Sequence, residues 1–291
     1  MRENVMWTEA QLIEDLQLLG LQEGMAVLAH TSLRAIGRID GGAETLLQSL
    51  RRVLGPAGTL MTPTFTFDHS DPAGWTNPPT SPDELERMRA LTPIFDVANT
   101  PSDRKWIGVF PEMVRSQFDV HRSNHPVVSF AAVGANARFL TENVPFHYPL
   151  GSDSPLARLH QIDGYVLLIG VDHRVNSSIH LAEVWAEAPY VHRSVALKTG
   201  LEEWTVMKGS PECSEGYTKL ESLLRHSRLL REGYVGNAAS QLVRQRALVS
   251  LAVAVLQGDA AGLLCDNADC RWCGVARKLT ATQSSAVGSE I

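Results

Sequence analysis

Three side chains that suit acid–base chemistry follow one another at helical spacing in the second half of the chain. Ser177, His180 and Glu183 are three residues apart, so in a helix they share one face. A carboxylate beside an imidazole favours the charged ring and fixes its tautomer, which suits a general base. The alternative is a helix cap followed by a histidine that packs or bonds locally. The sequence leaves both interpretations open.

A second polar segment, residues 29–37 (AHTSLRAIG), follows an apolar stretch that is typical of a buried strand. Small and hydroxyl-bearing residues that lead into a helix N-terminus can bind an anionic group through backbone N–H donors. Many strand-to-helix turns have the same composition, so a plain turn is the alternative.

Two further segments carry polar residues next to regular structure. Residues 121–134 (HRSNHPVVSFAAVG) place Arg122, Ser123 and His125 before a predicted strand, where they either meet a diphosphate or face solvent. Residues 151–159 (GSDSPLARL) have the pattern of a helix start, with Pro155 just inside the helix. Local structure alone explains the second segment.

The cysteines of the chain gather near its C-terminal end. Cys270 and Cys273 form a CxxC pair, which is half of a common structural zinc site. Cys213 and His192 flank a predicted hairpin, and we expect them to be the two zinc ligands that lie outside the CxxC pair. We therefore expect a Cys₃His zinc site, in which Cys265 is the alternative for either outside ligand. Free buried thiols are the alternative to a metal.

The elements expected around these segments alternate between strands and helices. Residues 8–20 predict an amphipathic helix with Thr8 as its N-cap and Gly20 as its stop. Strands are expected within 25–30, 59–67 and 164–171, a strand and a helix within 127–143, and helices within 43–55, 177–189, 219–230 and 237–256. This alternation predicts an α/β protein with a mostly parallel central sheet covered by helices on both faces. Such sheets bind ligands at the carboxyl ends of their strands, where the first two polar segments lie.

The Pro-rich segment 68–102 interrupts this alternation and holds only one short helical piece. A connection of that length inside a compact protein is usually functional or disordered. We expect a single domain over residues 1–275, with 68–102 as an inserted substrate loop, and a flexible tail over 276–291.

Composition and charge narrow the class of protein. With 291 residues, 44% of them hydrophobic, the chain can bury a sizeable core. A formal net charge of −6 argues against nucleic acid or an anionic membrane as the main partner. The N-terminal residues lack a signal-peptide pattern, and no apolar run reaches the ~20 residues of a membrane span. We expect a soluble cytoplasmic protein, either a monomer or a homodimer.

Taken in order, these segments resemble the aminoglycoside 3-N-acetyltransferase family, the antibiotic N-acetyltransferases that do not have the GNAT fold. The resemblance spans about residues 8–275 and is carried by HTSLRAIG (30–37) with GGAET (41–45), LGPAGTLMTPTF (54–65), RSNHPVVSFAAVG (122–134), GSDSPLARL (151–159), LLIGVDHRVNSSIHLAE (167–183) and REGYVG (231–236). Each motif is weak by itself, but this many in the same order are hard to obtain by chance. The resemblance implies an acetyl-CoA donor, an aminoglycoside acceptor and acetylation of the 3-amino group of its 2-deoxystreptamine ring, which gives antibiotic resistance.

The resemblance also implies roles for matching residues. His180 corresponds to the catalytic histidine of the family, Glu183 to the carboxylate that orients it, and Ser177 to a hydroxyl able to polarise the thioester carbonyl. A Cys and CxxC tail like the one in this chain occurs in some members.

Two segments are implied as contacts of coenzyme A. The first is the loop of His30, Thr31, Ser32, Leu33, Arg34, Ala35, Ile36 and Gly37, with its histidine near the reaction centre. The second consists of Arg122, Ser123 and His125.

The chemistry of acetyl transfer agrees with these roles. An aminoglycoside amine is largely protonated at neutral pH and must lose a proton before it attacks a thioester. A histidine, with an ordinary pKa of about 6.5, is a natural acceptor for that proton. The oxyanion that forms needs a donor such as the Ser177 hydroxyl or a helix N-terminal N–H. We expect direct attack in a ternary complex without an acyl-enzyme, and the cysteines lie outside the motifs, which argues against a cysteine nucleophile.

An aminoglycoside is a polycation, so we expect carboxylates in its site. The candidates are Asp68, Asp96, Asp172 and Glu212, with solvated loop acids as the alternative. Two other hypotheses remain. One is an acyltransferase of the same fold that acts on another amine, for instance in natural-product biosynthesis. The other is an inactive, zinc-stabilised binding protein, and the presence of His180 together with Glu183 speaks against it.

Overall fold

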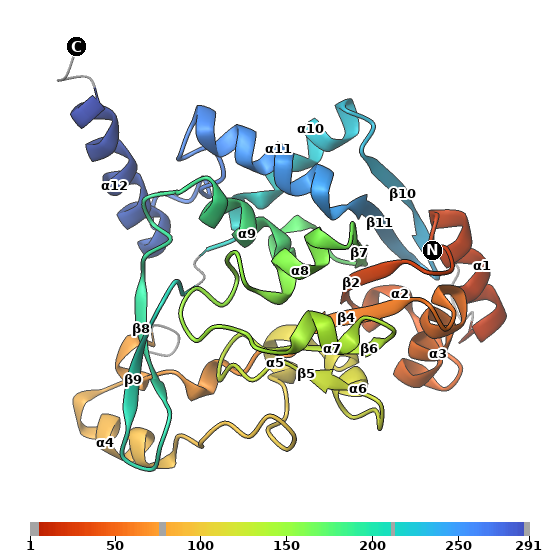
Figure 1. Ribbon diagram of the computed structural model, residues 1–291, viewed down its shortest axis with the longest axis horizontal. Helices are drawn as coiled ribbons and strands as arrows, with labels where there is room; N and C mark the ends of the chain where they lie inside the picture. Colours follow the sequence, from red (N-terminus) through yellow and green to blue (C-terminus); the bar gives the residue numbers. More distant parts are fainter. Residues whose placement is uncertain (1–5, 76–79, 211–212, 288–291) are drawn as a thin grey trace.

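The structure is a computed structural model that describes residues 6–75, 80–210 and 213–287, with only the backbone over 283–287 (Figure 1). Its strands are β1 (Met6–Trp7), β2 (Ala26–Thr31), β3 (Arg38–Ile39), β4 (Thr59–Pro63), β5 (His121–Arg122), β6 (Phe130–Gly134), β7 (Tyr165–Ile169), β8 (Ser194–Lys198), β9 (Trp204–Lys208), β10 (Leu230–Val235) and β11 (Ala238–Arg244). Its α-helices are α1 (Glu9–Leu19), α2 (Leu33–Ile36), α3 (Gly42–Leu54), α4 (Pro82–Leu91), α5 (Arg104–Ile107), α6 (Phe110–Arg115), α7 (Ala137–Thr141), α8 (Pro155–Gln161), α9 (Ser178–Trp185), α10 (Lys219–His226), α11 (Gln245–Gly258) and α12 (Arg271–Val287). Single turns of 3₁₀ helix are η1 (Phe67–His69), η2 (Pro72–Gly74), η3 (His173–Val175) and η4 (Glu215–Thr218). Within the described ranges, no helix has both the length and the apolar character needed to cross a membrane.

Seven strands form the central sheet in the order β10-β11-β7-β2-β4-β6-β5 (Figure 1). The central strands β7, β2 and β4 run parallel, whereas the outer pairings are antiparallel. The α/β class is confirmed, but the parallel part of the sheet is confined to these three strands. The outer strands differ from the expectation because β10–β11 and β5–β6 are hairpins, which need no helical crossover.

Side chains of the central strands alternate between two apolar cores. Val27 of β2 packs in the core that contains α1, α3 and α6, whereas Leu28 packs in the core that contains α8, α9 and α11. Leu167 and Leu168 of β7 divide between the two cores in the same way. Each of these leucines is 0% exposed, and each contributes roughly 1.5–3 kcal/mol by its burial. Helices therefore cover both faces of the sheet, as expected.

Local sequence fixes the ends of α1. The Thr8 hydroxyl accepts from the Gln11 backbone N–H at 3.4 Å, and the Gln11 side chain accepts from the Thr8 backbone N–H at 3.0 Å, which forms a capping box. Gly20 follows the last turn with a φ of 106°, a left-handed conformation that favours glycine. The predicted helix over 8–20 is confirmed.

The helix predicted over 237–256 is wrong in its first part, because residues 238–244 form strand β11. The strand follows β10 through a two-residue turn at 236–237, in which Gly236 has a φ of 61°. Pairing with β7 on its other side buries Leu242 and Val243, so tertiary structure outweighs the helical pattern. The helix predicted over 219–230 ends earlier, at His226, because strand β10 begins at Leu230.

Helix α12 continues through Val287, into the segment expected to be a flexible tail. It leaves the body of the protein at one edge (Figure 1). Its first turns are held because Cys273 and Ala276 pack in a small apolar cluster with Tyr190 and Leu264.

The Pro-rich segment 68–102 lies beside the β8–β9 hairpin, which forms a separate two-stranded sheet (Figure 1). The Asp71 backbone N–H donates to Ala196 O at 2.8 Å, and Lys198 Nζ donates to Arg89 O at 2.8 Å. The one short helix expected here is α4, which contains no buried residue. Polar contacts therefore hold α4 against the hairpin.

Candidate active site

A cavity of about 590 Å³ lies at the carboxyl ends of the parallel strands β2, β4 and β7. This is the edge at which α/β sheets bind ligands, and the volume suits a small organic molecule. The residues that line it are His30, Thr31, Ser32, Leu33, Arg34, Thr62, Pro63, Phe65, Phe67, Trp106, Ile107, Gly108, Val109, Phe110, Pro111, Val171, Arg174, Val175, Asn176, Ser177, His180 and Ser214.

The end of β2 and the start of α2 contribute residues 30–34 to the cavity. The other three residues of the expected coenzyme A loop lie elsewhere: Ala35 lines an adjacent groove, Ile36 is 0% exposed in the core, and Gly37 has a φ of 98° in the following turn. The Ser32 hydroxyl accepts from the Ala35 backbone N–H at 3.4 Å and so fixes the start of α2. The first five residues of the loop are therefore the ones that a ligand in the cavity can touch.

Two buried polar atoms on the cavity wall, His30 Nε2 and Thr31 Oγ1, have no hydrogen-bond partner among the described residues. An unpaired buried polar atom costs about 1–3 kcal/mol. Burial, together with the nearby His173, lowers the pKa of His30 to about 3, so its ring is neutral near pH 7. Two residues that line the cavity thus have hydrogen-bonding capacity that the described residues do not use.

His180 and Glu183 form the pair that their spacing predicted. His180 Nδ1 lies 2.8 Å from Glu183 Oε2, and the two side chains are only 13% and 9% exposed. A carboxylate oxygen only accepts, so the ring proton lies on Nδ1 and the lone pair on Nε2. His180 also lines the cavity. This arrangement can remove a proton from a bound amine.

Ser177 lies on the same wall, directly before α9, and is 5% exposed. We expected Asn176 or Ser177 to cap this helix. Asn176 does so, because its Oδ1 accepts from the Ser178 backbone N–H at 3.1 Å, whereas Ser177 makes no capping bond with its side chain. The Ser177 hydroxyl therefore remains on the cavity wall.

Sequence reasoning missed two parts of this site. Residues 106–111, around α5 and α6, form a wall of the cavity. Tyr217 of η4 is 0% exposed, and its hydroxyl lies 2.7 Å from His180 Nδ1. Neither part carried a local signal, because a tyrosine 37 residues from the histidine is recognisable only once the fold brings it to the ring.

Arg122, Ser123 and His125, expected as contacts of coenzyme A, bond within the protein instead. The Arg122 guanidinium donates to Thr64 O at 2.9 Å, and burial lowers its pKa to about 10. Ser123 Oγ accepts one backbone N–H at 2.8 Å, and His125 Nδ1 accepts two at 3.2 and 3.0 Å. Ser123 and His125 are 0% exposed, and none of the three residues lines the cavity. These side chains hold the connection between β5 and β6, and their contact with coenzyme A stays a prediction.

The sequence and the fold both match proteins of known class. Residues 28–257 match the family model described as aminoglycoside 3-N-acetyltransferase. The SPbeta prophage-derived aminoglycoside N(3')-acetyltransferase-like protein YokD of Bacillus subtilis (strain 168) is 34% identical over 239 residues, which cover 81% of this chain and 87% of YokD. The chain belongs to the aminoglycoside 3-N-acetyltransferase family.

Solved structures of aminoglycoside 3-N-acetyltransferases agree with this assignment. A mutant of AAC(3)-IVa in complex with a gentamicin is 31% identical and superposes with a TM-score of 0.80 over 96% of this chain and 100% of its own. AAC-IIIb in a binary complex with CoASH is 27% identical, with a TM-score of 0.75 over 87% of this chain and 97% of its own. The expected family and its non-GNAT fold are confirmed, and the protein is an acetyltransferase.

The carboxylates expected at the acceptor site of this acetyltransferase are Asp68, Asp96, Asp172 and Glu212. Glu212 lies outside the described residues, and the other three do not line the cavity. The Arg174 guanidinium donates to Asp172 at 2.7 Å, and the Asp96 carboxylate accepts backbone N–H groups of its own turn. Asp68 directly follows Phe67 and Asp172 directly follows Val171, and both of these neighbours line the cavity.

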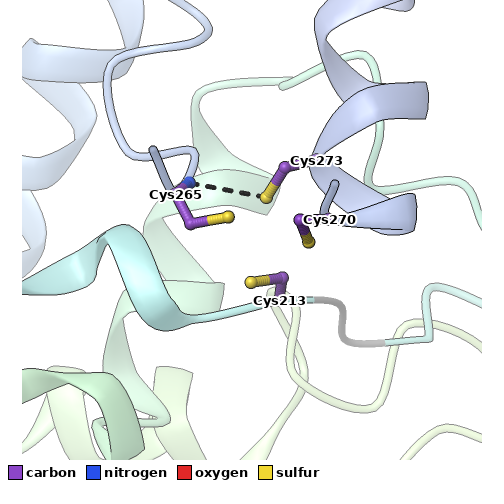
Figure 2. A group of neighbouring side chains, drawn as sticks. All are labelled: Cys213, Cys265, Cys270 and Cys273. Carbon is purple, nitrogen blue, oxygen red and sulfur yellow. Dashed lines mark hydrogen bonds between the residues drawn. The ribbon is translucent and has the colours of Figure 1, made fainter. Parts of the chain in front are cut away.

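The four cysteine thiols converge beside the start of α12, and their sulfur atoms all lie within 4.8 Å of one another (Figure 2). In a tetrahedral zinc site with Zn–S bonds of about 2.3 Å, the sulfur atoms lie about 3.8 Å apart. The four thiols therefore fit a tetrahedral metal ion. Three of them lie beyond residues 28–257, the range that matches the family model.

His192, which we expected as a ligand, does not belong to this group. Its Nδ1 lies 2.8 Å from the Tyr148 hydroxyl. Cys265 supplies the fourth thiol of the group. Its backbone N–H donates to Cys273 Sγ at 3.4 Å, which holds residue 265 beside the CxxC pair. The structure thus brings together four cysteines, with the alternative ligand Cys265 in place of the expected His192.

Proposed function

We propose that the protein transfers the acetyl group of acetyl-CoA to the 3-amino group of the 2-deoxystreptamine ring of aminoglycosides, which gives antibiotic resistance. The observation that carries the proposal is the His180–Glu183 pair on the wall of the cavity that residues 30–34 also line. The related structures named with a gentamicin and with CoASH support the two substrates.

The cavity suits the donor. Its largely apolar wall, which includes Phe65 and Trp106, suits the pantetheine arm of coenzyme A, and the exposed Arg34 is a cation for its phosphates. The acceptor would approach from the side of Asp68, whose carboxylate suits an ammonium group.

The reaction would proceed by direct attack in a ternary complex. His180 Nε2 takes a proton from the acceptor ammonium, and Glu183 stabilises the imidazolium through Nδ1–H. The freed amine forms a bond to the thioester carbon, and the C–S bond then breaks to release the coenzyme A thiolate. The thiolate takes up the proton held by His180. The nitrogen then releases its second proton to the regenerated His180 and from there to solvent, so the ammonium gives up two protons in all.

The oxyanion that forms during attack needs hydrogen-bond donors in a site from which water is excluded. The Ser177 hydroxyl lies on the same cavity wall as His180 and suits this role. The neutral ring of His30, with its unpaired Nε2, is a second candidate donor.

We also propose that the four cysteines hold a structural zinc ion. The thiols do not line the cavity, so the ion would contribute to folding rather than to the chemistry. Metal analysis of the purified protein should find one zinc per chain. Replacing Cys270 and Cys273 with Ser should abolish binding and lower the Tm, and protein purified without zinc but with an unchanged Tm would contradict the proposal.

A second acceptor class is favoured by one observation. No Asp or Glu occurs among the described residues that line the cavity, although a polycation would attract them. An acyltransferase of the same fold that acts on a less charged amine, for instance in natural-product biosynthesis, fits this lining.

A thiol-release assay with acetyl-CoA separates the two acceptor classes. The acceptors would be gentamicin, kanamycin, apramycin and a non-aminoglycoside amine, with the position of the acetyl group determined by NMR. Release that depends on an aminoglycoside, with the product acetylated at the 3-amino group, is expected. Release with the simple amine alone would favour the second class.

A further inference from the structure

Tyr217 contacts the catalytic pair from a part of the chain that lies far from it in sequence. Its hydroxyl is 2.7 Å from His180 Nδ1, and the two rings meet edge to face with centroids 5.3 Å apart. The side chain is 0% exposed, so water does not compete for these contacts. Tyr217 does not line the cavity and therefore does not contact the substrates directly.

Hydrogen-bond chemistry defines what the hydroxyl does. Nδ1 carries one proton, which points between the Glu183 carboxylate and the Tyr217 oxygen, so both oxygens accept from the ring. The Glu183 carboxylate also lies close enough to Tyr217 to act on its phenol electrostatically. Burial and this carboxylate hold the pKa of Tyr217 well above its usual value, so the phenol keeps its proton. Glu183 and Tyr217 therefore contact the same ring nitrogen, and together they fix the orientation of the imidazole.

The segment that carries Tyr217 is itself held by the residues that precede the CxxC pair. Gly216 packs so closely against Leu263 and Leu264 that an added Cβ would lie 2.3 Å from Leu263 O. On the other side of Tyr217, Lys219 Nζ donates to Leu264 O at 2.7 Å and to Asp266 at 2.6 Å. Cys213, at the start of the segment, belongs to the four-cysteine cluster (Figure 2). Contacts before and after Tyr217 therefore fix its position.

We propose that Tyr217 is a positioning residue for the His180–Glu183 pair, and that residues 263–266, beside the cysteine cluster, hold it in place. The inference rests on the proposed role of His180 as general base. A fold element outside the cavity thereby sets the orientation of the reacting imidazole. The cluster and its neighbours would then support turnover as well as folding.

Tyr217→Phe tests the hydroxyl with little change in shape. Loss of a hydrogen bond to a charged group predicts a roughly tenfold lower kcat with KM for both substrates unchanged. Tyr234→Phe, at an exposed tyrosine, is the matched control and should keep the wild-type kcat. The Tm and the zinc content of each variant report whether the fold and the cluster are intact. An unchanged kcat in Tyr217→Phe would overturn the proposal.

A double-mutant cycle distinguishes positioning from a general structural effect. If Tyr217 acts through Glu183, the Phe substitution should lose most of its effect on kcat in a Glu183→Gln background. Independent, multiplicative losses would reject action through Glu183. His180→Ala is the reference variant. If it keeps its turnover, the proposed function itself fails. If its kcat falls strongly while Tyr217→Phe keeps the wild-type kcat, only the present inference is rejected.

Lys219→Met tests the support of the segment. It removes the contacts to Leu264 and Asp266 while keeping a long side chain, and we expect kcat to fall about threefold with KM unchanged. Lys208→Met, at an exposed lysine of β9, is the control. Equal kcat in the two lysine variants would contradict the anchoring step.

Discussion

Two polar clusters of this acetyltransferase contain the same kinds of side chain but differ in what their polar atoms bind. We call residues 30–34 with Ser177 and His180 the open cluster, and residues 122–125 the closed cluster. In the first, His30 Nε2 and Thr31 Oγ1 are buried without a partner among the described residues. In the second, Arg122, Ser123 and His125 are bonded to other parts of the protein. Arginine, serine and histidine near a strand are therefore a site only where the fold leaves their polar atoms free.

The comparison also explains why the two clusters look alike in the sequence. Each stands next to a strand of the central sheet, and polar residues are common at such positions. The first lies at the carboxyl ends of parallel strands, where chain connections separate and leave a cavity. The second fills a hairpin connection between antiparallel strands, where backbone N–H groups need acceptors. The two clusters therefore differ in whether their polar atoms are already bonded within the protein.

The largest expected effect follows from removing the base of the open cluster. His180→Ala should lower kcat by a factor on the order of 10²–10⁴, the usual contribution of general acid–base catalysis. Binding of acetyl-CoA should survive, because the loop at 30–34 is unchanged. Steady-state kinetics combined with calorimetric titration of acetyl-CoA measures both quantities. Near-normal turnover would remove His180 from the mechanism and place the chemistry elsewhere.

Local patterns were enough to predict the His180–Glu183 pair but not its surroundings. The spacing of Ser177, His180 and Glu183 defines one helix face, and the capping residues of α1 define a helix boundary, so both were predictable. Tyr217 depends on a contact across 37 residues, and strand β11 depends on pairing with β7. Such long-range contacts leave no periodic signal. The sequence offered Cys265 as an alternative ligand, but only the folded chain shows that its thiol, and not the His192 ring, joins the other three cysteines.

The hydroxyl of the open cluster is the next test. Ser177→Ala removes a donor proposed to stabilise the oxyanion, and loss of one such donor lowers kcat by about 10². KM for acetyl-CoA should stay within a small factor, since the interaction strengthens only as charge develops. Ser123→Ala is the matched serine in the closed cluster and should leave kcat unchanged. If both alanine variants show the same kcat, the two clusters do not differ in the way we infer.

The closed cluster should respond in stability rather than in rate. His125→Ala leaves two buried backbone N–H groups without their acceptor and opens a small cavity. The free energy of unfolding should fall by roughly 2 kcal/mol, while KM for acetyl-CoA stays constant. Urea denaturation and steady-state kinetics provide the two numbers. A raised KM with normal stability would restore His125 to the coenzyme A site.

The last test concerns the pH dependence of stability and uses the same histidine. Burial lowers the pKa of His125 to about 4, below the ordinary histidine value near 6.5. As the pH falls from about 6.5 to 4, His125 binds a proton in the unfolded chain but not in the native protein. The stabilisation that comes from burying the neutral ring is therefore complete above the unfolded pKa and is lost toward pH 4. The slope from one such group is about 1.4 kcal/mol per pH unit. His125→Asn keeps a side-chain acceptor without the titration, so its stability should fall less steeply over this range than that of the wild type. Parallel curves for the two proteins would mean that His125 binds protons equally in both states, and that its cluster is open to water after all.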